Sequence, residues 1–218
     1  MRKILFIICW ALAGVGLYSC SLDEPSYGKT TSDNYYQKES DIEQALTGAY
    51  LQLRTTWNEY ALNHYFVGDC STDDALKGGG NDGDRAEVRD LSDFTIYTTN
   101  GEVGRRWEIL YRLINRCNDV IYYAPDAIGN EKLLKRYANE AKALRAFGYY
   151  CLVTTFGEVP LITTPMQPAE ILQIPRSPLE KVYECIVNDL TDASALPAKG
   201  DYSEDDACLL YTSPSPRD

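Results

Sequence analysis

The chain has 218 residues and carries 32 acidic side chains against 21 lysines and arginines, which gives a formal net charge of −11 at pH 7. This charge disfavours nucleic acid and other polyanions as ligands, because an acidic surface repels them. The length is enough for one hydrophobic core or for part of a larger domain. Neutral ligands are therefore the favoured class.

A short apolar segment opens the chain after two basic residues, Arg2 and Lys3. The run from residue 4 to residue 18 is shorter than the roughly 20 residues that cross a bilayer, so it is typical of a signal peptide. It ends in the sequence LYSC at residues 17–20, which resembles a bacterial lipobox. We therefore expect residues 1–19 to be removed and the sulfur of Cys20 to be lipidated, since two or more acyl chains anchor a protein durably. An ordinary secretory signal that leaves Cys20 as a thiol is the alternative.

Four amphipathic helices are predicted from apolar residues that recur at helical spacing. They cover about residues 40–53, 107–121, 131–156 and 178–196. The first and the last open with sequences of the capping-box type, SDIE at 40–43 and SPLE at 177–180. The third is expected to end at Gly157, a residue type that favours the C-terminal cap. Four such helices without sustained strand-like alternation indicate a mostly α fold of antiparallel helix pairs.

Residues 57–100 lose the helical period and are expected to form a long surface loop. The segment contains GDCSTDD at 68–74 and the Gly-rich GGGNDGD at 78–84. Its aspartates have hard oxygen ligands that could gather around calcium; they are Asp69, Asp73, Asp74, Asp82 and Asp84. Their spacing does not match an EF-hand, so solvated loop acids are the simpler interpretation, and no cofactor is expected.

Tyrosine is abundant, with 17 residues against five phenylalanines and three tryptophans. Its ring can stack on the C–H face of a sugar while its hydroxyl hydrogen-bonds. The helical tyrosines have the spacing of core residues; they are Tyr50, Tyr111, Tyr137 and Tyr183. The candidate ligand-binding residues lie in or near the loop and are Trp57, Tyr60, Tyr65, Asp73, Asp74 and Tyr97.

No catalytic set stands out, and we do not expect an enzyme. The chain has one histidine, His64, and no G-x-S-x-G sequence. Carboxylate pairs of the kind that hydrolyse glycosides can arise by chance among 32 acids. Glu140 and Arg145 lie beside an apolar helix face, which favours a buried ion pair or a helix-cap interaction over ligand binding.

Four cysteines of the predicted mature chain lie far apart, without C-x-x-C spacing; they are Cys70, Cys117, Cys151 and Cys185. Buried thiols are the favoured interpretation over a metal site, and one disulfide stays open as an alternative.

Several stretches resemble the SusD/RagB family of outer-membrane nutrient-binding lipoproteins. In chain order they are SCSLDEP at 19–25, DIEQALTGAYLQL at 41–53, GDCSTDDA at 68–75, WEILYRLINRCNDVI at 107–121, NEAKALRAFGYYCLVTTFGEVPLI at 139–162 and RSPLEKVYECIVNDL at 176–190. The stretch at 139–162 is the most specific. The acidic residues shortly after Cys20 also resemble the tag behind the lipidated cysteine of Bacteroidota surface lipoproteins.

The resemblance implies a superhelix of tetratricopeptide-like helix pairs with long decorating loops. Such proteins lie over a SusC-like TonB-dependent transporter, palmitate-anchored on the extracellular face of the outer membrane, and capture oligosaccharides without cleaving them. The alternatives are a peptide-capturing lipoprotein of the RagB kind and, less favoured, a surface glycoside hydrolase. A helical scaffold without a small ligand also stays open.

The same resemblance suggests how the chain is divided. Family members are about twice this length or more, so residues 20–207 are expected to be an incomplete N-terminal helical domain. The last residues, CLLYTSPSPRD at 208–218, resemble a translated sequencing-adapter remnant and are expected to be non-native, with a genuine disordered C-terminus as the alternative.

Overall fold

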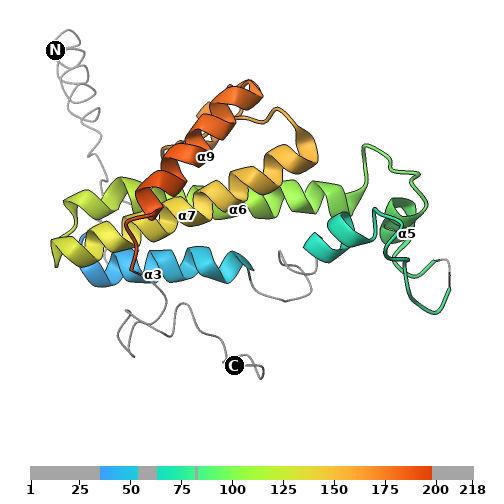
Figure 1. The fold of residues 1–218 in the computed structure, drawn as a ribbon, viewed down its shortest axis with the longest axis horizontal. Coiled ribbons are helices and arrows are strands. Elements are labelled where there is room, and N and C mark those ends of the chain that lie inside the picture. Colours follow the sequence, from blue (N-terminus) through green and yellow to red (C-terminus); the bar gives the residue numbers. More distant parts are fainter. Residues whose placement is uncertain (1–34, 54–62, 82, 198–218) are drawn as a thin grey trace, which may run out of the picture. The chain divides into compact units, whose positions relative to one another are not determined.

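The computed structural model describes residues 35–53, 63–81 and 83–197. These residues form helices and connecting segments, and the β-structure among them is limited to two isolated bridges, Lys38–Ile128 and Val159–Ser177. The helices, shown in Figure 1, are α3 (Glu39–Tyr50), α5 (Ala86–Ser92), α6 (Gly101–Tyr123), α7 (Glu131–Phe156), α8 (Pro168–Ile171) and α9 (Leu179–Ala193). None of these described helices is both long and apolar enough to cross a bilayer.

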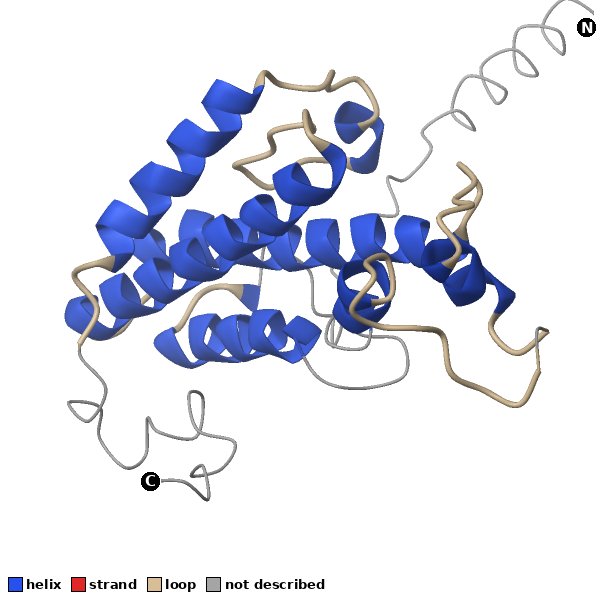
Figure 2. Cartoon of the chain, turned by 45° about the vertical axis from the view of Figure 1, so that its right-hand side comes forward, coloured by secondary structure: helices blue, strands red, loops and turns tan. Residues whose placement is uncertain are grey.

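Helices α6 and α7 form the central pair. They are joined by a short connection, pack along each other, and are flanked by α3 on one side and by α9 on the other (Figure 2). One apolar cluster joins α6, α7 and α9, and a second joins α3, α6 and α7. Gly148 permits the close approach of the central pair, because a Cβ there would lie 3.0 Å from Cγ1 of Ile114. The expected mostly α architecture is confirmed.

Asparagine caps set where the two long helices begin. The Asn130 side chain accepts hydrogen bonds from the N–H groups of Lys132 and Leu133, and α7 matches the predicted 131–156 at both ends. Gly157 follows it with φ of 71°, as predicted for its cap. Asn100 caps α6 in the same way, so α6 begins six residues before Trp107, where the apolar period first becomes recognisable.

The two predicted capping boxes are wrong in detail. Helix α3 begins at Glu39, and the carboxylate of Asp41 accepts a 2.9 Å hydrogen bond from the N–H of Lys38. Ser177 does not cap α9 with its side chain; its N–H donates instead to the carbonyl of Val159 at 3.0 Å. This bridge ties the start of α9 to the segment that follows α7, and such a long-range contact cannot be predicted from a local sequence pattern.

The segment predicted as a long loop contains helical turns. Tyr65–Asp69 is a π-helical turn, and α5 follows at Ala86–Ser92. Four buried side chains form a small separate core here; they are Phe66, Cys70, Val88 and Leu91. Helix α5 has only seven residues, so it is too short to show a helical period in the sequence.

Helix α9 buries one face and exposes another. Val182, Ile186 and Asp189 are buried. Its exposed apolar residues define what we call the α9 stripe: Leu179, Tyr183, Val187 and Leu190. Tyr183 is 43% exposed, so its prediction as a core residue is wrong, whereas Tyr137 is buried as predicted. The spacing correctly identified α9 as an amphipathic helix, but the core covers only Val182 and Ile186, and no described element covers the α9 stripe.

The four described cysteines are free thiols, with Cys70, Cys117 and Cys151 buried and Cys185 half-buried. The interpretation as buried thiols therefore describes three of them, and no disulfide joins any of the four.

Candidate ligand-binding site

The segment of residues 63–100, which we call the loop module, is fastened to the start of α6 through Glu102. This glutamate is buried, and its carboxylate pairs with Arg85 at 3.1 Å and with Arg105 at 3.7 Å. Its backbone carbonyl accepts a 2.8 Å hydrogen bond from the amide of Asn63. One acidic residue of α6 thus holds both the beginning of the loop module and the turn before α5.

A second fastening joins α5 to α6 through Glu87 and Asn100. The amide of Asn100 donates to the carbonyl of Glu87 at 2.9 Å, while the Glu87 carboxylate accepts from the N–H of Gly101 at 2.9 Å. The side-chain oxygen of Asn100 also caps α6. Because the cap and the contact use the same side chain, the end of the loop module is fixed at the first turn of α6.

The loop module displays aromatic rings at its surface. Tyr97 and Phe94 are each 65% exposed, and Tyr65 is 45% exposed. Phe94 adopts a left-handed backbone conformation with φ of 56°, which is uncommon for a bulky residue and terminates α5 in a turn. The sequence predictions included Tyr65 and Tyr97 but missed Phe94 and the exposed Ile96. Their proximity to Tyr97 in an aperiodic stretch was the available signal.

The predicted site residues occupy two parts of the loop module. Tyr65 begins the π-helical turn, and Asp73 and Asp74 are exposed in the turn that follows it, whereas Tyr97 lies between α5 and α6. No hydrogen bond or ring contact in the described part of the chain joins Tyr97 to the other three. Trp57, Tyr60 and Cys20 lie outside the described residues.

The chemistry of Tyr65 suits hydrogen bonding to a neutral ligand. The neighbouring Cys70 raises the pKa of the Tyr65 phenol, and burial raises the pKa of the Cys70 thiol. The phenol also hydrogen-bonds to the Cys70 side chain, and its oxygen can accept a hydrogen bond from a ligand.

A separate cleft of about 400 Å³ lies between α6 and the connection from α7 to α9. Trp107, Tyr111 and Asn115 line it from one face of α6 at four-residue spacing. The opposite wall is formed by Pro160, Ile162, Ile171 and Leu172. The Trp107 ring packs edge-on against Phe156, with ring centroids 5.1 Å apart, and tilted against Tyr111 at 4.8 Å.

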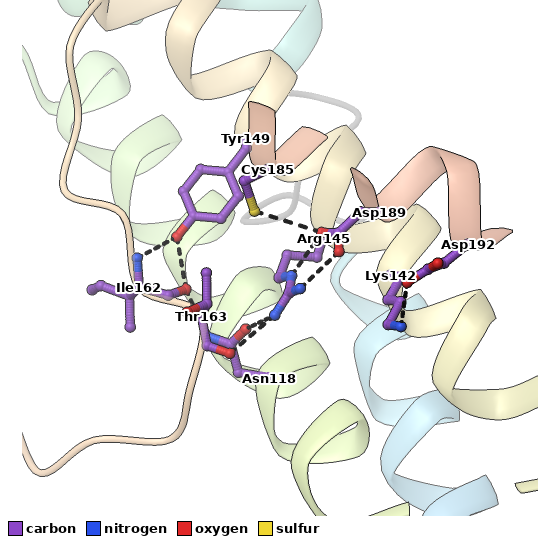
Figure 3. A network of polar contacts seen from close by, with 9 residues as sticks. All are labelled: Asn118, Lys142, Arg145, Tyr149, Ile162, Thr163, Cys185, Asp189 and Asp192. Atoms are coloured by element: carbon purple, nitrogen blue, oxygen red, sulfur yellow. Dashed lines mark hydrogen bonds and ion pairs between the residues drawn. The ribbon is translucent and has the colours of Figure 1, made fainter. Parts of the chain in front are cut away.

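Buried polar groups hold the wall of this cleft in place, as Figure 3 shows. The Tyr149 hydroxyl accepts from the N–H of Ile162 at 2.7 Å and donates to the carbonyl of the same residue at 2.8 Å. The amide of Asn118 donates to that carbonyl at 2.9 Å, and Arg145 donates to the carbonyl of Thr163 at 3.0 Å. The backbone groups of this connection between α7 and α9 are therefore hydrogen-bonded, as they would be in a helix or a strand.

Arg145 is the centre of this network. Its guanidinium makes two hydrogen bonds to the carboxylate of Asp189 on α9, at 2.7 and 2.8 Å, and one to the side-chain oxygen of Asn118 on α6, at 2.9 Å. Of the two predicted alternatives for Arg145 and Glu140, a buried ion pair and a helix-cap interaction, the structure shows the ion pair, but the two residues do not pair with each other. Glu140 pairs with Arg136 at 3.4 Å and accepts from the Tyr50 hydroxyl at 3.1 Å.

Residues 21–210 match the model of the SusD-like family, which is described as starch-binding and associating with the outer membrane. The chain belongs to the SusD-like family. Among curated relatives, SusD-like protein P2 of Formosa agariphila is 30% identical over 193 residues, which cover 86% of this chain and 36% of the relative. SusD-like protein P25 of the same organism is 26% identical over 200 residues, covering 86% of this chain and 37% of the relative. The SusD-like chain thus spans about a third of the length of these relatives.

Solved structures show the same fold. A laminarin-binding SusD-like protein is 32% identical with a TM-score of 0.65, over 72% of this chain and 34% of that one. The surface glycan-binding protein A of Bacteroides fluxus is 29% identical with a TM-score of 0.62, over 75% of this chain and 34% of that one. The tetratricopeptide-like arrangement of helix pairs expected for a SusD-like protein is therefore confirmed.

His64 of this SusD-like chain takes part in packing. Its Nδ1 lies 3.2 Å from a terminal nitrogen of Arg106, whose Nε donates to the Thr155 hydroxyl at 2.8 Å. These contacts join the loop module, α6 and α7.

Among the described residues, no three His, Cys, Asp or Glu side chains are grouped so that they could hold an ion. Asp82 lies outside the described part, so solvated loop acids stay the prediction for this segment and calcium stays the alternative.

Proposed function

We propose that this protein binds neutral glycans at the outer membrane, without cleaving them, and delivers them to a SusC-like TonB-dependent transporter. The observation that carries the proposal is the display of exposed tyrosines and aspartates on the loop module of a SusD-like chain. Relatives with the same fold are described as laminarin-binding and as surface glycan-binding proteins, which supports a glycan as the ligand class.

The exposed side chains supply the two interactions that a sugar needs. The ring faces of Tyr65 and Tyr97 can stack on its C–H face, and Asp73 and Asp74 can accept hydrogen bonds from its hydroxyls. The same carboxylates, on a chain with a net charge of −11, repel sulfated and uronic acid polymers. A neutral oligosaccharide is therefore the favoured ligand.

The binding test is calorimetry of the chain against a panel of neutral oligosaccharides, laminarin oligosaccharides included. Tyr97→Ala should weaken binding about tenfold, because it removes an exposed stacking ring. Tyr122→Ala is the matched control, since Tyr122 is also exposed, at 55%, but lies near the far end of α6. Binding of peptides instead of glycans would contradict the proposal in favour of a peptide-capturing protein. Release of reducing ends from the panel would reveal a hydrolase.

Cys20 is the proposed site of attachment to the outer membrane. Mass spectrometry of the protein expressed in a lipoprotein-processing host should find Cys20 as the acylated first residue, and proteinase treatment of intact cells should remove the protein from the surface. Cys20→Ser should release it from the membrane fraction, because the acyl chains supply the anchoring energy. An unacylated Cys20 or a soluble wild-type product would contradict the anchor.

The proposed transporter partner is tested by co-purification. Affinity capture of the protein from detergent-solubilised outer membranes should recover a TonB-dependent transporter as a stoichiometric partner. Recovery of the protein alone would contradict delivery while leaving glycan binding to be judged by calorimetry.

A further inference from the structure

The cleft beside α6 has the composition of a site for an uncharged ligand. Its described lining contains Trp107, Tyr111, aliphatic side chains and two amides, and no Asp, Glu, Lys or Arg. Its volume of about 400 Å³ lies within the range of small-molecule pockets, which are also mostly apolar with a few polar groups. A charged ligand entering this cleft would lose hydration without gaining a partner charge.

Two polar side chains of the cleft hydrogen-bond to its wall, and a third lies at the rim, where it can contact a ligand. Asn118 contributes both side-chain atoms to the wall, since its nitrogen donates to Ile162 and its oxygen accepts from Arg145. The Tyr111 hydroxyl donates to the carbonyl of Pro160 at 2.7 Å. Asn115, by contrast, is exposed on α6 one turn beyond Tyr111, where its amide can donate and accept at the rim of the cleft.

One part of the cleft is also preformed. Its wall at residues 160–163 is held by side chains from both α6 and α7: Tyr111 and Asn118 from the first helix, Tyr149 and Arg145 from the second. Arg145 is in turn fixed by Asp189 of α9. This wall therefore loses its conformational entropy when the protein folds, and ligand binding does not require that loss again.

We propose that this cleft is a second glycan-binding site, which takes a neutral sugar unit between Trp107 and the wall at Pro160 and Ile162. The sugar packs its C–H face against the apolar lining and hydrogen-bonds through a rim hydroxyl to Asn115. This inference rests on the proposed function for its ligand class. The second site is separate from the exposed tyrosines of the loop module, because its lining comes from the middle of α6 and from the connection between α7 and α9.

The test is ¹⁹F NMR of the full chain labelled with 5-fluorotryptophan and titrated with laminarihexaose. The chain has three tryptophans, and Trp107→Phe assigns the signal of the cleft. We expect the Trp107 signal to shift on titration. Asn115→Ala should raise the dissociation constant read from that signal about fivefold, the effect of losing one hydrogen bond. Asn188→Ala is the matched control, since it makes the same substitution at an exposed position of α9 and should leave the constant unchanged.

The outcomes separate this inference from the proposed function. If calorimetry detects laminarihexaose binding but the Trp107 signal does not move, the second site is disproved while the proposed function stands. An equal effect of Asn115→Ala and Asn188→Ala disproves it as well. If calorimetry detects no glycan binding at all, both the second site and the proposed function are disproved. A Trp107 shift produced by an apolar peptide and not by the sugar would identify the cleft as a polypeptide-docking surface and overturn the assignment.

Discussion

The helix pairs and the loop module are held together by different means. The pairs α3, α6, α7 and α9 share two large apolar clusters and the buried Arg145–Asp189 ion pair. The loop module has four buried apolar side chains and depends on polar contacts to the first turn of α6, through Glu102 and Asn100. Most of the folding free energy must therefore reside in the helix pairs.

This difference separates stability from recognition within one chain. A rigid helical base positions a smaller segment whose exposed rings are free to meet a ligand. Small local cores open at lower free energy than the whole molecule does. Substitutions in the helix pairs should therefore change global unfolding, whereas those in the loop module should change local opening and binding.

The largest expected effect comes from Arg145→Met. This change leaves Asp189 as a buried carboxylate without its partner and removes the hydrogen bonds to Asn118 and Thr163. The free energy of unfolding should fall by about 3–5 kcal/mol, measured by denaturant titration. Arg145→Met combined with Asp189→Leu should recover most of this loss, because both charges are then absent. A single variant as stable as the wild type would show that the network does not hold the helix pairs.

The partners of Arg145 illustrate what the sequence could and could not predict. The burial of Arg145 followed from its place beside an apolar face of α7. Its partner Asp189 lies 44 residues later on another helix, and Glu140, which is nearer in sequence, pairs elsewhere. Which charges meet depends on how α7 and α9 are aligned, and helix periodicity carries no information about that alignment.

The same limit applies to the loop module and to α9. Helix α5 was missed because seven residues give too little of the apolar period. Tyr183 was assigned to the core because spacing shows which face of a helix is apolar but not whether another element covers it. The exposed Tyr65 and Tyr97 were predictable because they lie outside the periodic segments, whereas Trp107 and its cleft depend on tertiary packing.

The second largest effect is expected from Leu91→Ala in the loop module. Leu91 is 1% exposed and belongs to the small core with Phe66, Cys70 and Val88. Truncation should cost about 2–3 kcal/mol, but only against the local stability of the loop module. Hydrogen exchange should therefore speed up in α5 and in residues 65–70 while α6 and α7 keep their protection.

Asp93→Ala is the control for the loop module, because it truncates an exposed side chain just after α5 and removes no buried apolar surface. Its exchange rates in α5 should stay close to those of the wild type. If Leu91→Ala accelerates exchange in α7 as much as in α5, the two regions unfold together and the comparison fails.

Substitutions in the α9 stripe are expected to change the free energy of unfolding less than Leu91→Ala does, but to reduce association of the protein measurably. Tyr183 and Val187 are 43% and 59% exposed, and contiguous exposed apolar surface promotes association. Tyr183→Lys with Val187→Lys should reduce concentration-dependent association in sedimentation velocity. The free energy of unfolding should change by less than about 0.5 kcal/mol per site.

Asn188→Lys is the control for the α9 stripe, because it adds a charge to the same helix at an exposed polar position. If it reduces association as much as the stripe variant does, added charge and not loss of apolar surface is responsible.

The smallest effect is expected at the second ion pair between α7 and α9. Lys142 and Asp192 meet at 2.6 Å near Arg145 and Asp189 (Figure 3), but Asp192 is exposed, so water and salt screen the pair. The hydrogen bond from Lys142 lowers the pKa of the Asp192 carboxyl in the folded state. The stability that this ion pair contributes is therefore present above the ordinary pKa of an aspartate and is lost as the pH falls through the lowered pKa of Asp192.

Lys142→Ala should raise the pKa of Asp192 in an NMR titration while leaving the denaturation midpoint at neutral pH within experimental error. A midpoint shift as large as that of Arg145→Met would mean that burial is not what distinguishes these two ion pairs.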